Sequence, residues 1–150
     1  MNSECVNNWK QQGSVSLWRY PTGSRQRYPG LNTHADSRAT QSLVALTQCL
    51  LEDVSGTRTI RLSEPSPAAL SSAGFDRDYE WFTKIKLDYE RERRGLVFEI
   101  VGETVLLAIG YSGVRELRRA LERYDKGDYD FAIPCDVIGG GKYDRAVWFW

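Results

Sequence analysis

The chain has 150 residues, of which 41% are hydrophobic and 12% aromatic, enough to bury the core of one soluble domain without staples. Its 20 basic residues balance its 20 acidic residues, so no net field attracts nucleic acid or an anionic membrane at long range. No apolar run approaches the roughly 20 residues that span a bilayer, which excludes a membrane protein.

The first half of the chain predicts two strands, a helix and a third strand. Apolar residues alternate in the strands and form a stripe with a period of about 3.6 residues in the helix. Asp36 or Ser37 supplies the helix N-cap, and Ser55-Gly56 ends the helix. The segments are a strand over 14–20, a turn region up to Tyr28, a strand over 31–34, a helix over 38–53 and a strand over 57–62.

A connection rich in Ser, Pro and Ala over residues 63–72 joins the two halves of the chain. Pro65 and Pro67 forbid regular hydrogen-bonded structure over several residues. We therefore expect a polar segment over 1–13 and one α+β domain over 14–150, with halves over 14–62 and 75–150.

The second half predicts the order ββαββ after a first strand. Gly102-Glu103 is a strong signal for a two-residue hairpin turn, Ser112 is a plausible N-cap, and Lys126-Gly127 ends the helix that Ser112 begins. The segments are strands over 85–89, 96–101 and 104–109, a charged turn over 91–95, a helix opened by residues 111–113, a strand over 129–135 and a final strand over 146–150.

The final strand carries Trp148, Phe149 and Trp150, so it must be buried in a sheet rather than exposed. The short hairpins predict a largely antiparallel sheet with both main helices on one face. An offset of 74 residues places Leu43 on Leu117, which leaves open an internal duplication of two ββαβ-like halves.

Three cysteines, Cys5, Cys49 and Cys135, are widely spaced and include no C-x-x-C pair. An odd number at such spacing indicates buried free thiols in a reducing cytosol, not a disulfide framework or a zinc site. Residues 1–12 are polar and lack the apolar run of a signal peptide. We therefore expect a cytoplasmic protein without a metal or another cofactor.

The only histidine, His34, lies two residues before Asp36. This pair is the basis of one hypothesis, a small enzyme or ligand-binding domain with an acid–base site. Ser37, Ser42 or Cys49 would have to approach it in space as a nucleophile, because none has a recognisable spacing. The alternative, which we favour, is a histidine with a structural role in a protein that is not an enzyme.

Two segments place carboxylates beside aromatic rings, which is the composition of protein-recognition surfaces. Their rings are equally consistent with the core or its edge, with the acids as solvated neighbours. The residues that we predict to bind a partner protein are Tyr79, Trp81, Asp125, Asp128, Tyr129 and Asp130.

Seven arginines surround the charged turn and the second helix, with glutamates between them. If the turn and the helix adjoin, these arginines form either a basic patch or, together with the glutamates, a salt-bridged solvated face. We favour the solvated face and expect no nucleic-acid partner. The residues are Arg91, Arg93, Arg94, Arg115, Arg118, Arg119 and Arg123.

The C-terminal half resembles small bacterial immunity proteins of polymorphic toxin systems. The resemblance is carried by the hairpin over 96–110, the G-x-x-E-L helix start over 113–117, the G-D turn over 127–130 and the aromatic residues 148–150. It implies a non-enzymatic protein, a monomer or homodimer, that binds and neutralises a cognate toxin. An adaptor subunit of a larger assembly, which presents a sheet edge to its partner, is a further alternative.

Overall fold

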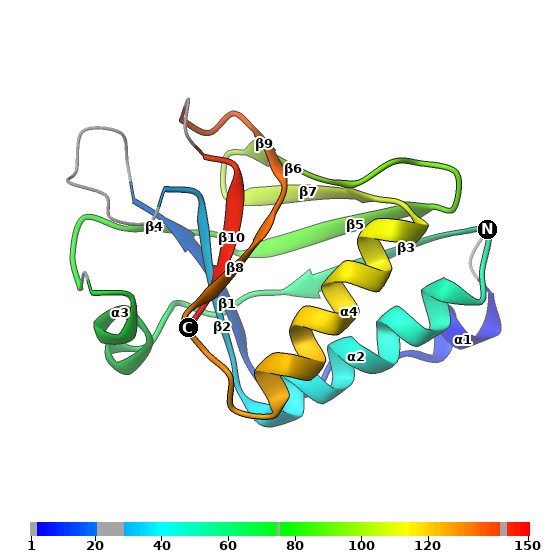
Figure 1. The fold of residues 1–150 in the computed structure, drawn as a ribbon, viewed down its shortest axis with the longest axis horizontal. Helices are drawn as coiled ribbons and strands as arrows, with labels where there is room; N and C mark the ends of the chain where they lie inside the picture. The colour runs from blue at the N-terminus through cyan, green and yellow to red at the C-terminus, as the bar shows by residue number, and fades with distance from the viewer. Residues whose placement is uncertain (1–2, 21–28, 75, 142–143) are drawn as a thin grey trace.

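Two five-stranded sheets and two long helices make up the fold (Figure 1). The computed structural model describes residues 3–20, 29–74, 76–141 and 144–150. Its elements are α1 (Glu4–Asn8), β1 (Val15–Arg19), β2 (Leu31–Ala35), α2 (Ser37–Leu51), β3 (Ser55–Arg61), α3 (Pro67–Ala73), β4 (Glu80–Trp81), β5 (Lys84–Glu90), β6 (Leu96–Val101), β7 (Thr104–Ile109), α4 (Tyr111–Asp125), β8 (Phe131–Pro134), β9 (Asp136–Ile138) and β10 (Ala146–Phe149).

The first sheet has the strand order β4-β1-β2-β10-β8. The predicted final strand, β10, lies inside it, parallel to β2 with Val147 opposite Leu31 and antiparallel to β8 with Phe149 opposite Phe131. The terminal aromatics are therefore inserted between two strands that are distant in sequence. The turn region that we predicted up to Tyr28 includes residues 21–28, which lie outside the described residues.

The second sheet has the strand order β3-β5-β7-β6-β9. The predicted hairpin is confirmed: β6 and β7 pair antiparallel around Gly102, whose φ of 62° is the left-handed value that a tight turn needs. β5 and β7 pair in parallel, and so do β6 and β9. Since β8 belongs to the first sheet and β9 to the second, the chain passes from one sheet to the other at Cys135.

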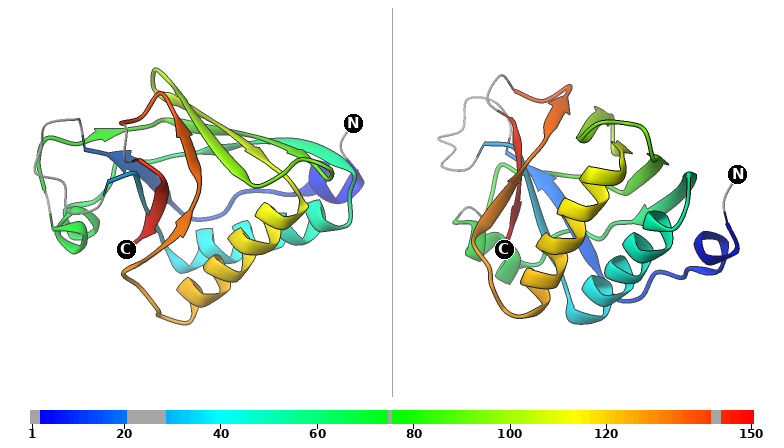
Figure 2. Two further views of the ribbon diagram at one scale, coloured as in Figure 1. Left: turned by 45° about the horizontal axis from the view of Figure 1, so that its top comes forward. Right: turned by 45° about the vertical axis from the view of Figure 1, so that its right-hand side comes forward.

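The α+β class with largely antiparallel pairing is confirmed, but the strands form two sheets rather than one. Helices α2 and α4 pack against each other and lie side by side across the open side between the sheets (Figures 1 and 2). One core contains buried side chains from both sheets and both helices, among them Leu17, Leu46, Phe98, Leu121 and Phe149. Ten strands in one twisted sheet would leave distant strands without a shared core, which the split avoids.

The two segments with ββαβ order are shared between the sheets. Strands β1 and β2 belong to the first sheet, whereas β3, which follows helix α2, belongs to the second. Strands β6 and β7 belong to the second sheet, whereas β8, which follows helix α4, belongs to the first. In each segment, the strand that follows the helix therefore joins the sheet that contains the first two strands of the other segment.

The Pro-rich connection contains a helix, α3, so our prediction of no regular structure over residues 63–72 is wrong. Pro67 occupies the first helical turn, where its missing N–H has no intrahelical partner to lose. The Ser66 side chain accepts a hydrogen bond from the Ala69 N–H, and Gly74 ends the helix at a φ of 89°. Burial of Leu70 and its neighbours against Trp18 and Tyr20 stabilises this short helix.

The N-cap of helix α4 lies two residues earlier than we predicted. Gly110, not Ser112, is the N-cap, and no side chain caps the helix. A Cβ at Gly110 would lie 1.6 Å from the Arg93 carbonyl oxygen, so only glycine permits this approach between the charged turn and the helix. The helix ends as predicted at Lys126, followed by Gly127 at a φ of 91°.

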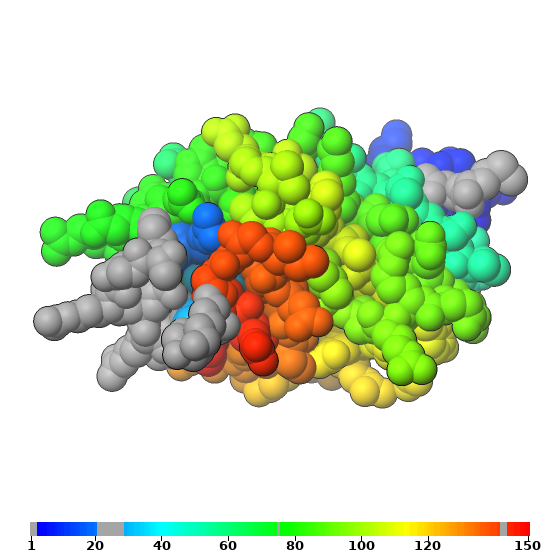
Figure 3. Space-filling view, turned by 90° about the horizontal axis from the view of Figure 1, so that it is seen from above, coloured from blue at the N-terminus to red at the C-terminus, as the bar shows by residue number. Residues whose placement is uncertain are grey.

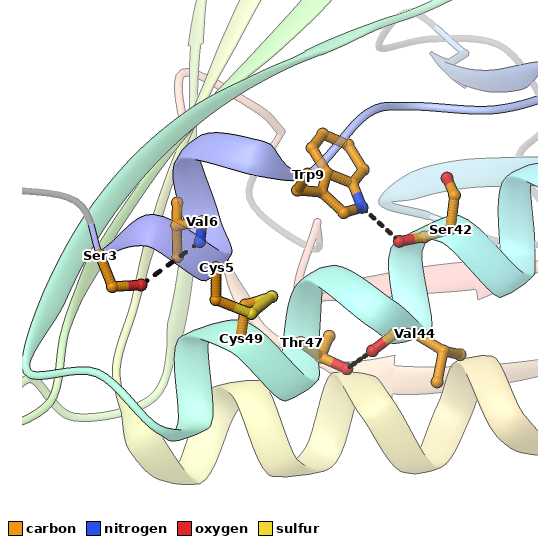
Figure 4. The surroundings of a disulfide bond; sticks show 8 residues. All are labelled: Ser3, Cys5, Val6, Trp9, Ser42, Val44, Thr47 and Cys49. Atoms are coloured by element: carbon orange, nitrogen blue, oxygen red, sulfur yellow. Dashed lines mark hydrogen bonds between the residues drawn. A yellow bond between two sulfur atoms is a disulfide. The ribbon is translucent and has the colours of Figure 1, made fainter.

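A disulfide joins Cys5 and Cys49, which lie 44 residues apart in sequence, with their Cα atoms 5.5 Å apart. Our prediction of free thiols is therefore wrong for these two residues and is confirmed only for Cys135, which is buried. Burial raises the pKa of the Cys135 thiol to about 12, so it is a poor nucleophile. Figure 4 shows α1 lying across α2 with the bridge between them.

Breaking the Cys5–Cys49 bridge should lower the free energy of unfolding by about 3–5 kcal/mol, because the bridge restricts a long loop of the unfolded chain. Urea unfolding of the wild type with and without a reductant measures this loss. The double variant Cys5→Ser, Cys49→Ser should be as unstable as the reduced wild type and insensitive to the reductant. An unchanged wild-type midpoint on reduction would contradict a stabilising bridge.

Deleting Trp148, Phe149 and Trp150 should abolish cooperative folding. The Phe149 ring stacks on Phe131 with centroids 5.0 Å apart, and the Trp150 Nε1 donates to the Asn32 Oδ1 at 2.8 Å. Each buried aromatic contributes about 1.5–3 kcal/mol, whereas a whole domain is stable by roughly 5–15 kcal/mol. Calorimetry tests this, and a truncated chain with the wild-type melting temperature would refute it.

Candidate functional site

The His34 ring lies on β2 and is held by α4 and by the backbone that follows β10. Its Nδ1 is 2.8 Å from the backbone oxygen of Trp150 and 3.0 Å from the Tyr124 hydroxyl. That hydroxyl donates to the same Trp150 oxygen and accepts from the Ala35 N–H at 3.3 Å. In this arrangement, His34 joins three separate elements of the fold.

Asp36 is the N-cap of α2. Its Oδ1 accepts from the Ala39 N–H and its Oδ2 from the Ser14 N–H, both at 2.8 Å. Desolvation acts to raise the pKa of this carboxyl, but the two backbone hydrogen bonds and the nearby charge of Arg38 hold the pKa below its ordinary value. One oxygen of the carboxylate therefore caps the helix, and the other ties the cap to the residue that precedes β1.

The nucleophiles that we considered for a His34–Asp36 site are engaged elsewhere. The Ser42 hydroxyl donates to the Ala39 carbonyl and accepts from the Gln12 N–H, each at 3.2 Å. The Ser37 hydroxyl accepts from Gln41, and Cys49 is in the disulfide. Within the part of the chain that the structure describes, no group of three or more His, Cys, Asp and Glu side chains is placed to hold a metal ion.

The first acidic–aromatic segment lies at the β4 edge of the first sheet. Tyr79 packs on the cluster around Trp18, and its hydroxyl lies 3.3 Å from Glu64. Trp81 pairs with Trp18 across the strands and keeps 36% of its surface exposed. Tyr79 is thus part of the edge of the core, whereas Trp81 is accessible to a partner.

The second segment lies between α4 and β8, at the opposite edge of the same sheet. Tyr129 is 56% exposed and packs edge-on against Tyr124, with ring centroids 5.0 Å apart. Asp128 forms an ion pair with Arg123. Asp125 and Asp130 are both exposed. The two segments are separated by the full width of the sheet, so the fold does not bring them into one patch (Figure 1).

The charged turn and the start of α4 do meet. The guanidinium carbons of Arg91 and Arg115 lie 4.6 and 6.0 Å from the centre of the Tyr111 ring. Acids accompany the neighbouring arginines: Arg93 pairs with Asp88 and Glu90, Arg118 with Glu122, and Arg123 with Asp128. These pairs support a salt-bridged face rather than a basic patch.

A concave surface that was not among our sequence predictions lies on the outer face of the second sheet. On β5 the buried Ile85, Leu87 and Tyr89 face the core, so the residues between them face solvent. A cleft of about 1200 Å³ lies on this side of the sheet. Its lining includes Trp9, Lys10, Gln11, Gln12, Thr57, Thr59, Arg61, Lys86, Asp88, Glu99, Leu106 and Ala108.

The strand register places an apolar centre on this outer face. Leu106 lies between Lys86 on one side and Glu99 on the other, and Glu99 lies beside Ile138. Ile138 and Val101 expose 54% and 53% of their surface. Figure 3 looks down on the molecule from the side of this sheet, with β9 (orange) beside the β6–β7 hairpin (yellow-green) and α1 (blue) at one end.

Residues 9–12, which we call the strap, close one side of the cleft. The Gln11 side-chain amide donates to the Arg61 carbonyl at 2.7 Å and accepts from the Arg61 N–H at 2.8 Å. It therefore occupies the free edge of β3 as a neighbouring strand would. The Trp9 Nε1 donates to the Ser42 carbonyl at 2.6 Å (Figure 4), which ties the strap to α2.

Comparison with known proteins finds no relative. No protein-family model matches the chain, and neither a curated protein nor a solved structure matches it. No helix in the described ranges is long and apolar enough to cross a membrane.

Replacing Asp36 by alanine should lower the free energy of unfolding by about 1 kcal/mol near neutral pH, because α2 loses its cap. The folded-state pKa is lowered, so this contribution is present above the ordinary pKa and is lost as the pH falls through the folded pKa. The difference between wild type and variant should therefore shrink below about pH 4.

Urea unfolding near neutral pH and near pH 3 measures this dependence. Asp76→Ala, a change at an exposed carboxylate in a loop, is the control and should have little effect at either pH. A loss of stability for Asp36→Ala that is the same at both pH values would contradict the role of the charged carboxylate.

Proposed function

We propose that the protein is a non-enzymatic immunity-type protein that binds and neutralises a cognate bacterial toxin, with the outer face of the second sheet as its main contact surface. The observation that carries the proposal is the uncovered cleft of about 1200 Å³ on that face. The half-buried Leu106 lines the cleft, and the exposed Val101 and Ile138 lie on the same face among charged residues. An apolar centre with a polar rim is the usual anatomy of a protein–protein interface.

The rigidity of this face also supports a binding function. Its residues stand on paired strands, and the strap that closes one side is held by Gln11, by Trp9 and, through α1, by the disulfide. A surface that is already ordered loses little conformational entropy when a partner binds. The roles of His34 and Asp36 within the fold give no support to the enzyme hypothesis.

The two acidic–aromatic segments are secondary contacts in this proposal. Trp81 and Tyr129 are both accessible, but they lie at opposite edges of the other sheet. A partner centred on the second sheet need not cover both. An adaptor subunit would use the same kinds of surface, so the distinguishing property is protection from a toxin.

Expressing this chain should restore the growth of cells that produce the cognate toxin, which we expect to be encoded by a neighbouring gene. Leu106→Asp should abolish protection and weaken binding by at least about 2 kcal/mol, because it replaces the apolar side chain at the centre of the interface with a charged one. Val54→Asp is the matched control, since Val54 is 73% exposed and does not line the cleft. Growth rescue, calorimetric binding and thermal melts give the three readouts.

Trp81→Ala and Asp128→Ala test the secondary contacts in the same assays. If Trp81 is a contact, its variant binds more weakly while melting normally, whereas Asp128→Ala mainly slows association. Variants that melt early but bind with wild-type affinity would remove both residues from the interface. The absence of any neighbouring gene whose product is neutralised by this chain would sink the immunity proposal.

A further inference from the structure

Four basic residues lie together at one corner of the outer face of the second sheet. Arg61 on β3 lies directly opposite Lys84 on β5, and Lys86 is the next outward-facing residue of β5. Lys10, on the strap, lines the same cleft as Arg61 and Lys86. We call Lys10, Arg61, Lys84 and Lys86 the cationic corner.

The cationic corner is electrostatically unfavourable in the free protein. Like charges directly opposite each other on neighbouring strands repel, as Arg61 and Lys84 must do. No ion pair between described residues involves any of the four side chains. The side chains therefore keep a repulsion that a bound carboxylate would relieve.

At the other end of the same strand pair, the charged side chains have partners of opposite sign. Asp88 and Glu90, which follow Lys86 on the outward face of β5, lie 3.3 and 3.6 Å from the Arg93 guanidinium. The chain as a whole carries no net charge. The cationic corner is therefore a local imbalance, placed beside the apolar centre at Leu106, which lies opposite Lys86.

We infer that the cationic corner binds an acidic segment of a partner protein, with its carboxylates at Arg61, Lys84 and Lys86 and its apolar side chains on Leu106 and Ala108. The inference rests on the proposed function only in taking the partner of this face to be a protein. Complementary charges of this kind select the partner and speed its association.

A protein segment fits this surface better than nucleic acid does. Single-stranded nucleic acid is held by rings that stack on its bases as well as by cations. Trp9 is the only aromatic residue among the described residues that line the cleft, and it is 7% exposed. Its ring lies under the Arg58 guanidinium at 5.4 Å, so it offers no open face to a base.

Short synthetic peptides test the inference without knowledge of the toxin. The probes are a peptide that alternates Glu and Leu, the same peptide with Gln or Lys in place of Glu, and a short oligo-dT. Amide chemical shifts of β3 and β5 report the site, and their titration gives the affinity. The acidic peptide should bind at least about tenfold more tightly than the Gln peptide, and salt should reduce the difference.

Charge reversal provides the matched comparison. The double variant Lys84→Glu, Lys86→Glu should prefer the Lys peptide to the acidic one. It should melt no lower than the wild type, because a glutamate at position 84 would face Arg61 as an attractive pair. Arg119→Glu, a reversal on the exposed surface of α4, should leave the wild-type preference unchanged.

The outcomes separate this inference from the proposed function. If the wild-type protein prefers the acidic peptide and the charge-reversed variant does not, the inference is supported even if no neighbouring toxin is neutralised. Equal affinity for the Glu, Gln and Lys peptides, or no binding of the acidic peptide at low salt, overturns it. Tighter binding of oligo-dT than of the acidic peptide also overturns it and makes the corner a nucleic-acid surface. Growth rescue lost with Leu106→Asp but retained with the charge-reversed variant shows that the toxin's segment is not acidic, which likewise overturns it.

Discussion

The insertion of β10 between β2 and β8 is the contact on which the rest of the structure depends. It supplies backbone hydrogen bonds to both neighbours and brings Phe149 onto Phe131 in the core. Because β8 continues into β9, the same insertion holds β9 beside β6 in the second sheet. The pairing of this one short strand thus keeps both sheets in place.

The Trp150 backbone extends this constraint to helix α4. Its N–H donates to the Thr33 carbonyl at 3.1 Å, and its oxygen accepts from the Tyr124 hydroxyl beside His34. The only histidine of the chain therefore contributes to the junction between sheet and helix. A lone histidine near a carboxylate is compatible with catalysis, but here the physical roles of both side chains are to join elements and to cap one.

The outer face of the second sheet combines a stable scaffold with a surface that carries like-charge repulsion and exposed apolar side chains. Disulfide, strap and paired strands fix its shape, whereas the repulsion between Arg61 and Lys84 and the exposure of Ile138 are unfavourable in the free protein. Natural proteins tolerate such costs where a partner removes them. The neutral net charge of the chain does not indicate this local excess of positive charge, because basic and acidic residues are equal in number but unevenly placed.

The sequence by itself determined the elements that depend on neighbouring residues. The β6–β7 hairpin follows from Gly102, the end of α4 from Gly127, and the burial of β10 from its aromatics, since each is a local preference of backbone or side chain. We did not predict the α3 helix, because we took Pro65 and Pro67 as breaks in regular structure and did not consider Ser66 as an N-cap with proline in the first turn.

Only the tertiary structure decided how distant segments meet. The division into two sheets, the Cys5–Cys49 bridge, the separation of Trp81 from Tyr129 and the facing pair of Arg61 and Lys84 all depend on strand partners and register. Pairing joins residues far apart in the chain, and alternation along a strand says which residues share a face but not which strand lies beside it. For that reason the candidate site, which spans five strands and the strap, could not be predicted from the residues alone.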